Sequence, residues 1–361
     1  MADKPVIIFG AGATKACGGP LTNEILPDAF REGDAIEREH YLELVGRFLT
    51  DIFHVPGDPA LRQDDDFPAL PLLLALLDNA IDRKHSFGPN WPVDELAHVR
   101  DGIEYLIFAL IAYRLRTLTK NYYYDFLRMI KDQGISDINV ISINYDIIVD
   151  NALCILSEQE HISGFPDYGA DISTQFYRDV NKFGKLLKLH GSLNWLYCPG
   201  CDNLELGITE SERSTIKVTN ELYNESSLEE RYSCHGSPCS KCGTFVRPVL
   251  ITPTHMKDYR NPHISQIWYE AGRTLQQADR VIFVGYSLPE DDVDVTYLLK
   301  RGLSNIPASS ITVVEFDPEH RALRENPVGR RYRSLFGDDL DWHTEGFGNW
   351  VDTHGAYCVS D

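Results

Sequence analysis

Short β-branched and aromatic runs recur along this chain, separated by helical stretches, and each run ends in glycine or polar residues. Runs of this length and composition are typical of buried strands. Strands that alternate with helices predict a parallel sheet, with ligands binding outside the carboxyl ends of the strands. The expected fold is therefore α/β, with a Rossmann-like open parallel sheet. The expected strands are Val6–Phe9, Asn139–Ile143, Lys185–Leu189, Arg280–Val284 and Ile311–Phe316.

Two segments depart from this alternation. Residues 21–135 are mostly helical in pattern, which predicts a helical insertion, and the aromatic residues of 94–130 would serve as core or as a self-association surface. Residues 198–245 are polar and cysteine-bearing, with too few apolar residues for a separate core, which favours a small metal-stapled module. The ranges that complete the Rossmann-like core, within one domain spanning residues 1–361, are 139–197 and 246–361.

The composition argues against several classes of protein. Hydrophobic residues make up 43% of the chain and charged residues 24%, as in a globular protein, and 361 residues suffice for a core of ordinary size. The formal charge of −20 disfavours a surface that follows nucleic-acid phosphates, because such surfaces concentrate Lys and Arg. No apolar run reaches the roughly 20 residues of a membrane helix, and no leader precedes the first strand. We therefore expect a cytoplasmic protein that binds neither nucleic acid nor membrane directly.

The segment GAGATKACGGP, residues 10–20, follows the first expected strand. Its glycines permit a sharp turn and a close approach of the backbone to a pyrophosphate, and the amide groups that start the next helix would face the phosphates. The segment is not the common dinucleotide fingerprint, because Lys15 stands where the third glycine is required. A tight turn without a ligand is the alternative. The residues expected at a nucleotide are Gly10, Ala11, Gly12 and Thr14.

Two further strand ends carry side chains suited to chemistry. In the segment SINYD, residues 142–146, Asn144 and Asp146 bring an amide and a carboxylate to a strand end. An Asx turn would also account for these two residues. In KLHGSL, His190 offers an imidazole that can accept a proton near neutral pH, with a structural histidine as the alternative. We expect Ser192 to cap a turn or a helix and not to act as a nucleophile.

Two Cys-x-x-Cys pairs indicate a structural zinc site, because each pair can present two thiolates to one tetrahedral ion. A disulfide framework is not expected in a reducing compartment. Cys234 and His235 lie between the pairs and are competing ligands. Loop cysteines without metal are one alternative, and a redox site is another, although a redox site would need only one pair. The four expected ligands are Cys198, Cys201, Cys239 and Cys242.

Two further segments are GYSL, residues 285–288, and VVEFDP, residues 313–318. Together with them, the segments above resemble the sirtuin superfamily from the first strand to the last. Gly285 and Ser287 are similar to the sirtuin Gly-Thr-Ser that lines the dinucleotide, and Glu315 stands where sirtuins usually have Asn. A serine hydrolase is disfavoured, because GYSL lacks the last glycine of a G-x-S-x-G elbow. A carboxylate at Glu315 would accept hydrogen bonds from a ribose diol and repel a 2′-phosphate, which favours NAD over NADP.

The resemblance also implies roles near the bond that would be cut. Asn144 would position the nicotinamide carboxamide and a water molecule, and Asp146 would lie near that water or the ribose. His190 would act as the base or as a group that stabilises the ribose cation. NAD is therefore expected as the substrate.

Three departures from the sirtuin pattern fall on the side that handles protein substrates. Leu21–Asn23 replaces Asp-Phe-Arg, Ile143 replaces the Gln that orients the cofactor ribose, and Thr252–Thr254 replaces the Phe-Gly-Glu expected after Arg247-Pro248. In these features the chain resembles the sirtuin-like proteins of bacterial anti-phage systems, whose family activity is NAD hydrolysis. The resemblance thus implies an NAD glycohydrolase that yields nicotinamide and ADP-ribose. A protein deacylase and a non-catalytic NAD or ADP-ribose sensor are the alternatives. Because such an activity needs control, we expect a homo-oligomer, and a partner ATPase or other defence protein is a further expected partner.

Overall fold

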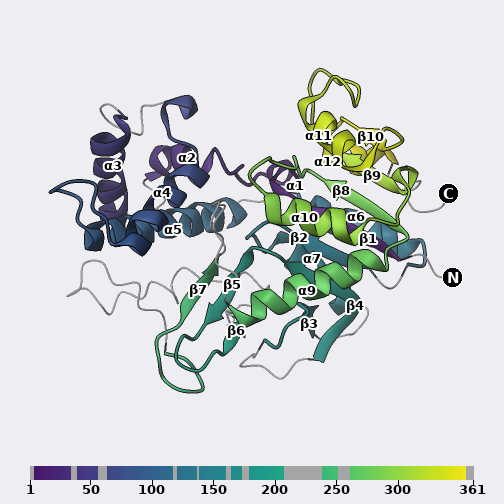
Figure 1. Cartoon of the computed structure of the whole chain (residues 1–361). Helices are drawn as coiled ribbons and strands as arrows, with labels where there is room; N and C mark the ends of the chain where they lie inside the picture. Colours follow the sequence, from purple (N-terminus) through teal and green to yellow (C-terminus); the bar gives the residue numbers. More distant parts are fainter. Residues whose placement is uncertain are drawn as a thin grey trace.

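The computed structural model describes residues 4–33, 39–55, 63–116, 120–135, 138–159, 164–172, 179–206, 238–250 and 261–354. Within these ranges a seven-stranded sheet has the order β10-β9-β8-β1-β2-β4-β3, and all its neighbouring strands are parallel (Figure 1). This arrangement confirms the predicted α/β fold with an open parallel sheet. The strands are β1 (Pro5–Phe9), β2 (Asn139–Ser142), β3 (Gly164–Asp167), β4 (Asp179–Lys188), β8 (Arg280–Val284), β9 (Ile311–Val314) and β10 (Asp341–His343).

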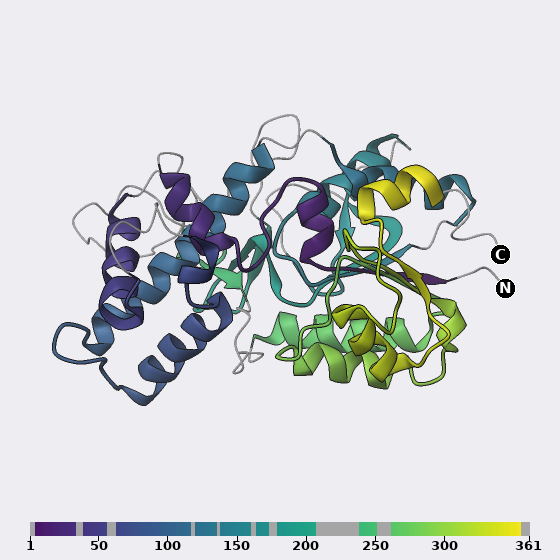
Figure 2. The same ribbon diagram turned by 90° about the horizontal axis from the view of Figure 1, so that it is seen from above.

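Helices cover both faces of this sheet, which is why its central strands are apolar throughout (Figure 2). In β1 every residue is buried, and in β8 only the first is not. One face is covered by α9 (Pro262–Gln276) and α10 (Val293–Gly302), with α11 (Pro327–Phe336) beside them. The opposite face is covered by α1 (Ala11–Ala16), α6 (Tyr122–Asp132), α7 (Ile148–Gln159) and α12 (Phe347–His354).

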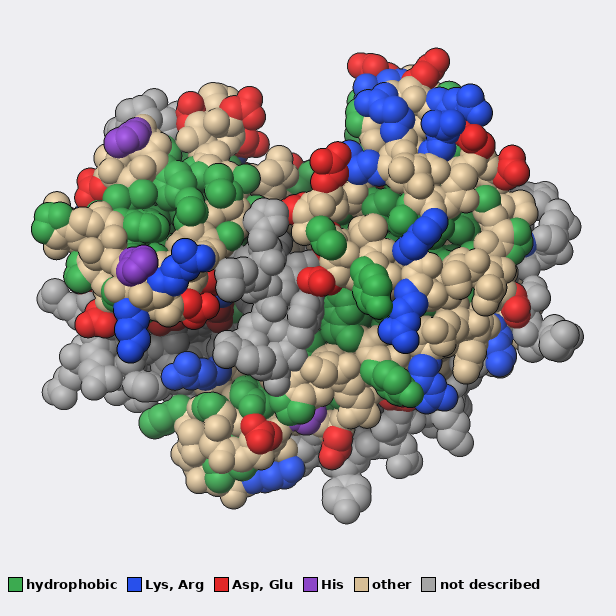
Figure 3. Space-filling view, in the orientation of Figure 1, with side chains coloured by type: hydrophobic (Ala, Val, Ile, Leu, Met, Phe, Trp, Pro, Cys, Tyr) green, Lys and Arg blue, Asp and Glu red, His purple; other side chains and the backbone are tan. Residues whose placement is uncertain are grey.

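A second hydrophobic core lies in a helical unit beside the sheet, on the left in Figure 1. Its long helix α5 contacts the other three, so apolar faces from all four helices meet around it. On the face drawn in Figure 3, hydrophobic side chains gather over this unit, and α4 exposes Leu72 and Leu76. The unit consists of α2 (Ile25–Arg31), α3 (Glu39–Phe53), the short helix η3 (Asp64–Asp66), α4 (Leu70–Arg83) and α5 (Val93–Arg116).

The aromatic residues of the segment 94–130 are mainly core. Tyr105 and Phe108 are buried in the helical unit, whereas Tyr123 and Phe126 of α6 are buried against the sheet. These four side chains therefore cannot form the self-association surface suggested above, because they are already enclosed within the chain. Among the described residues, no helix is long and apolar enough to cross a membrane.

A small antiparallel sheet of order β6-β5-β7 connects the two cores. Its strands are β5 (Gly191–Tyr197), β6 (Leu204–Leu206) and β7 (Arg247–Leu250). Leu193 and Leu196 of β5 pack into the helical unit, and Trp195 packs against the large sheet. Strict alternation fails here because the pairing of β5 with β7 shifts register between Ser192 and Leu196. Ser192 lies within β5 and donates its hydroxyl proton to Asn194 Oδ1, so its expected role as a cap is wrong.

Candidate functional site

The order in which strands join the large sheet switches sides at β1: β2, β3 and β4 lie on one side of it, and β8, β9 and β10 lie on the other. Open parallel sheets bind ligands at such a switch point. Strand β1 has β8 on one side and β2 on the other, with β4 beyond β2. The four carboxyl ends therefore lie along one edge. They lead directly into the predicted segments that contain Gly10, Asn144, His190 and Gly285. In the β2–β4 register Ser142 is opposite Lys188, so Asn144 and His190 each lie two residues beyond a matched pair.

The loop after β1 and the loop after β8 are packed together through their glycines. The Gly12 N–H donates to the Gly285 carbonyl at 2.8 Å, and a Cβ added at Gly12 would lie 2.8 Å from Gly285 Cα. Gly285 has a φ of +61°, and a Cβ there would lie 2.2 Å from the Ala13 nitrogen. Contact between the loops thus requires these glycines, and the Gly12 N–H donates within the protein. Gly10 also packs against this turn, with an added Cβ 2.6 Å from the Gly285 oxygen.

Substitution of Gly285 by alanine should therefore be strongly destabilising. A left-handed backbone costs an alanine about 1 kcal/mol, and overlap with the Ala13 nitrogen should raise the total above about 3 kcal/mol. Gly134→Ala is a matched control, because Gly134 has a φ of +86° with nothing within 4 Å of an added Cβ. Urea denaturation of both variants measures the difference. Equal losses of stability would show that the two loops are not held in close contact.

A buried cluster of hydrogen bonds joins the first loop to SINYD. Thr14 Oγ1 donates to Asp146 Oδ2 at 2.6 Å, and Asn144 Nδ2 donates to Thr14 Oγ1 at 2.9 Å and to the Gly10 carbonyl at 2.8 Å. The Tyr123 hydroxyl lies 3.1 Å from Thr14 Oγ1 and 3.4 Å from Asn144 Nδ2. Because the Thr14 proton is directed to Asp146, Tyr123 is the donor to Thr14.

These bonds fix the orientation of the Asn144 amide. A carbonyl oxygen can only accept, so the atom that faces Gly10 O must be the nitrogen Nδ2. The other amide atom, Oδ1, makes no hydrogen bond to any described residue. The structure thus holds an amide oxygen ready to accept a hydrogen bond at the edge of the sheet.

Asp146 is fully engaged within the protein. Besides accepting from Thr14, its Oδ1 accepts from the Ile148 N–H at 2.9 Å and so caps α7, as the Asx-turn alternative anticipated. Burial raises the pKa of Asp146, and the nearby Lys188 ammonium and the Thr14 bond oppose that rise. Its geometry suits a residue that holds Thr14 and α7 in place.

The residues from Ile143 to Ile148 also link the two hydrophobic cores. Ile143 and Ile148 pack under the large sheet, whereas Ile147 is buried in the helical unit and Tyr145 packs against it. The Tyr145 carbonyl accepts from the Leu193 N–H at 2.9 Å, which ties the segment to the small sheet. The loop that presents Asn144 is therefore held from several sides.

His190 lies in the turn after β4, where its side chain is buried. Its Nε2 lies 3.9 Å from Asp292 Oδ1, and Asp292 is also buried. The Tyr286 hydroxyl donates to Asp292 Oδ2 at 2.7 Å, which fixes the carboxylate. The Tyr145 ring lies 6.3 Å from the imidazole, centroid to centroid. A carboxylate at this distance stabilises a protonated imidazole and so suits a histidine that accepts a proton.

Sequence reasoning missed Asp292 and Tyr123. Asp292 lies four residues beyond GYSL, in the acidic run Glu290-Asp291-Asp292, where composition alone indicates an exposed loop. Tyr123 occurs in an aromatic cluster on a helix, a pattern that indicates core. No signal in the sequence distinguishes Tyr123 as a partner of the strand-end residues.

The candidate residues of GYSL and VVEFDP differ in exposure. Ser287 is exposed and its carbonyl accepts from the Arg331 guanidinium, with its Nε at 3.0 Å and its Nη2 at 2.8 Å. Glu315 follows β9, and its Oε2 is buried without a hydrogen-bond partner among the described residues. Burial raises the pKa of Glu315, while the Phe316 N–H and Arg331 lower it. An unpaired buried carboxylate oxygen is costly unless something binds it, so Glu315 is suited to a ligand with hydroxyl donors.

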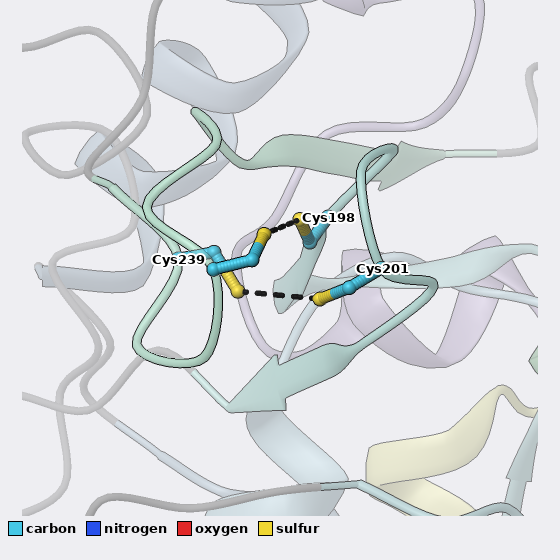
Figure 4. A group of neighbouring side chains, drawn as sticks. Cys198, Cys201 and Cys239 are labelled. Atoms are coloured by element: carbon cyan, nitrogen blue, oxygen red, sulfur yellow. Dashed lines mark hydrogen bonds between the residues drawn. The ribbon is translucent and has the colours of Figure 1, made fainter.

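The four predicted zinc ligands converge between the small sheet and the helical unit (Figure 4). Their sulfur atoms all lie within 4.8 Å of one another, with Cys198–Cys242 at 3.4 Å and Cys201–Cys239 at 3.7 Å. A tetrahedral ion with Zn–S bonds of about 2.3 Å needs sulfur atoms about 3.8 Å apart, so the arrangement fits zinc. The competing ligands Cys234 and His235 lie outside the described residues.

Glu205 holds the turn that carries Cys239 and Cys242. Its Oε1 accepts from the Ser240 N–H at 3.0 Å, from the Ser240 hydroxyl at 2.7 Å and from Asn203 Nδ2 at 2.8 Å. These bonds fix the turn between Cys239 and Cys242. Outer residues of this kind orient the ligands of a metal site.

No family model and no curated protein matches this chain. A solved structure of a Sir2 homologue in complex with NAD is 14% identical, with 98% of this chain and 88% of that chain covered and a TM-score of 0.46. A mutant Sir2 homologue with 2′-O-acetyl-ADP-ribose is 14% identical, with 98% and 91% covered and a TM-score of 0.47. A structure on the mechanism and regulation of Sir2 enzymes is 15% identical, with 99% and 92% covered and a TM-score of 0.39.

Proposed function

We propose that this protein is an NAD glycohydrolase, in which water displaces nicotinamide from the ribose C1′ of NAD to give ADP-ribose and a proton. The observation that carries the proposal is the arrangement at neighbouring strand ends. Asn144 lies after β2, with an amide oxygen that makes no hydrogen bond to any described residue, and His190 lies after β4 with Asp292 beside it. An acceptor for the substrate and an acceptor for the proton are the two groups that this reaction requires.

In the proposed reaction each group has a defined task. Asn144 Oδ1 accepts a hydrogen bond from the nicotinamide carboxamide or from the attacking water. His190 takes the proton that water releases as its oxygen bonds to C1′, or stabilises the cationic ribose, and Asp292 stabilises the resulting imidazolium. Asp146 acts indirectly, by holding Thr14 and the loop of Asn144.

The nucleotide half of NAD would lie along the same edge towards β8 and β9. Gly10, Ala11, Gly12 and Thr14 would line its phosphates, together with the turn of Gly285 and Ser287. Glu315 supports this placement, because a ribose diol would supply the donors that its buried Oε2 lacks. The zinc site would be structural, since it lies in the second core.

The test is to incubate purified protein with NAD and to measure nicotinamide and ADP-ribose, with and without an acetyl-lysine peptide. We expect NAD to be consumed at the same rate in both. If turnover requires the peptide and yields one nicotinamide per acetyl group removed, the protein is a deacylase. If NAD binds but no nicotinamide is released under any condition of assembly, it is a sensor.

The proposed role of Glu315 predicts a preference for NAD over NADP. NADP should be cleaved more slowly than NAD at equal concentration, because Glu315 would repel the 2′-phosphate. Glu315→Ala should narrow this gap, chiefly by raising the KM for NAD. Glu319→Ala is the control, since the Glu319 side chain is 71% exposed. A ratio of NAD to NADP cleavage that is the same in wild type and Glu315→Ala would contradict this role.

The proposal includes a biological setting taken from the resemblance of the motifs to bacterial anti-phage proteins. Unregulated NAD cleavage would deplete its host, so the enzyme would be a latent defence effector. Its NAD-cleaving activity would be switched on by self-assembly, by a partner ATPase or by another defence protein. Activity measured across size-exclusion fractions tests this control: one rate per chain in all states would argue against assembly as the switch.

A further inference from the structure

A fully buried lysine lies directly beneath the candidate site. Lys188 is the last residue of β4, and its side chain is 0% exposed. Its ammonium donates to the Asp146 carbonyl and, at 3.0 Å, to Asp150 Oδ2 of α7. Lysine is almost never buried without a partner, so its presence here needs an explanation.

The lysine belongs to a continuous polar network. Asp150 Oδ1 accepts from the Tyr168 hydroxyl at 2.5 Å, and Tyr168 in turn accepts from Asn194 Nδ2 at 3.4 Å. Every member of the network is buried, and it connects α7 with β4 and β5. The charge of Lys188 is thus balanced by Asp150, and Asp150 is held by Tyr168.

Stability alone does not account for this pair. Replacement of a buried ion pair by apolar residues of similar size is often neutral or stabilising. What an apolar side chain could not provide is a donor for the Asp146 carbonyl, in the irregular segment between β2 and α7. Lys188 is also two residues before His190 on the same chain segment. One ammonium therefore links the loop of Asn144 and Asp146 to the strand that carries His190.

We infer that Lys188 is a positioning residue for the proposed NAD cleavage, which fixes Asn144 relative to His190 while Asp150 balances its charge. The inference depends on the proposed function for its catalytic consequence. It depends on the structure alone for the placement of the loop. The two parts can therefore be tested separately.

The experiment uses the double variant Lys188→Met/Asp150→Asn, which removes both charges and retains the side-chain volume. The control is Lys185→Met/Glu270→Gln, because the Lys185–Glu270 ion pair joins the same strand to α9 on the other side of the sheet. For folded protein, kcat and KM for NAD are measured, with hydrogen exchange of the segment 142–150. We expect kcat to fall at least about tenfold with KM within about threefold, and exchange of the segment to quicken. The control should match wild type in all three.

Each outcome of this experiment supports or overturns the positioning role of Lys188. A folded double variant with wild-type kcat and exchange overturns the inference. If wild type releases no nicotinamide, the proposed function fails, and faster exchange in the variant still supports the placement. If the double variant does not fold, Lys188→Arg keeps the charge but cannot reproduce the two bonds of a compact ammonium. It should lower kcat at least about fivefold, and unchanged kcat in that variant overturns the inference.

Discussion

Replacement of His190 by alanine should lower the rate of nicotinamide release at least about a hundredfold, the usual contribution of a general base. Water would then lose the group that accepts its proton, and Asp292 would face an empty space. His85→Ala is the matched control, because His85 is exposed two residues after the end of α4 in the helical unit, and should retain wild-type activity. Circular dichroism and thermal melting check that both variants are folded.

Asn144→Ala should have an effect of similar size for a different reason. It removes the amide oxygen offered to the substrate, and it also removes the donor to Gly10 and Thr14. The two variants should differ in nucleotide binding: His190→Ala should bind NAD like wild type, whereas Asn144→Ala should bind it more weakly. Wild-type rates of cleavage in both folded variants would show that the site has been assigned to the wrong residues.

Loss of zinc should have the largest effect on stability. Purified protein should contain about one zinc ion per chain, and Cys198→Ser should lose the ion and aggregate or unfold in this region. Binding of structural zinc to four ligands contributes on the order of 10 kcal/mol to folding, and Cys198 and Cys239 are also part of the second core. The control is Cys154→Ser, because Cys154 lies on α7 outside the cluster.

Metal content is measured on protein purified without chelators, together with urea denaturation before and after chelation. The Cys154→Ser variant should retain its zinc and most of its stability. The prediction of a structural zinc site would be wrong if the purified protein contained no zinc, had four reactive thiols and were as stable as expected for the zinc-bound form.

The central strands could be predicted because they are buried on both faces, so their composition is distinct. The structure confirms β1, β2, β8 and β9 within a few residues of the expected bounds. The edge strands escaped prediction: β10 has three residues, and β3 contains Pro166, a residue that argues against a strand. The position of β1 in the sheet also could not be predicted, because its pairings with β2 and β8 join segments more than a hundred residues apart.

For the candidate site, the sequence could predict which residues follow strand ends, but it could not predict which residues come from helices or from other loops. Asn144 and His190 are brought together because neighbouring parallel strands end at one edge. Tyr123 and Asp292 reach them from elements whose residue patterns indicate core and exposed loop. The use of the Gly12 amide by Gly285 also could not be foreseen, because it depends on how closely two loops approach.

The residues from Ile143 to Ile148 contribute side chains to both hydrophobic cores, so the two cores are coupled in unfolding. Ile143 and Ile148 cannot leave the sheet without displacing Ile147 and Tyr145 from the helical unit, since only a few bonds of backbone separate them. The helices could not melt while the sheet remained native around its strand ends. We therefore expect the helical unit and the sheet to unfold together, and a displacement of the helical unit to reach Asn144 through Tyr145 and Ile147.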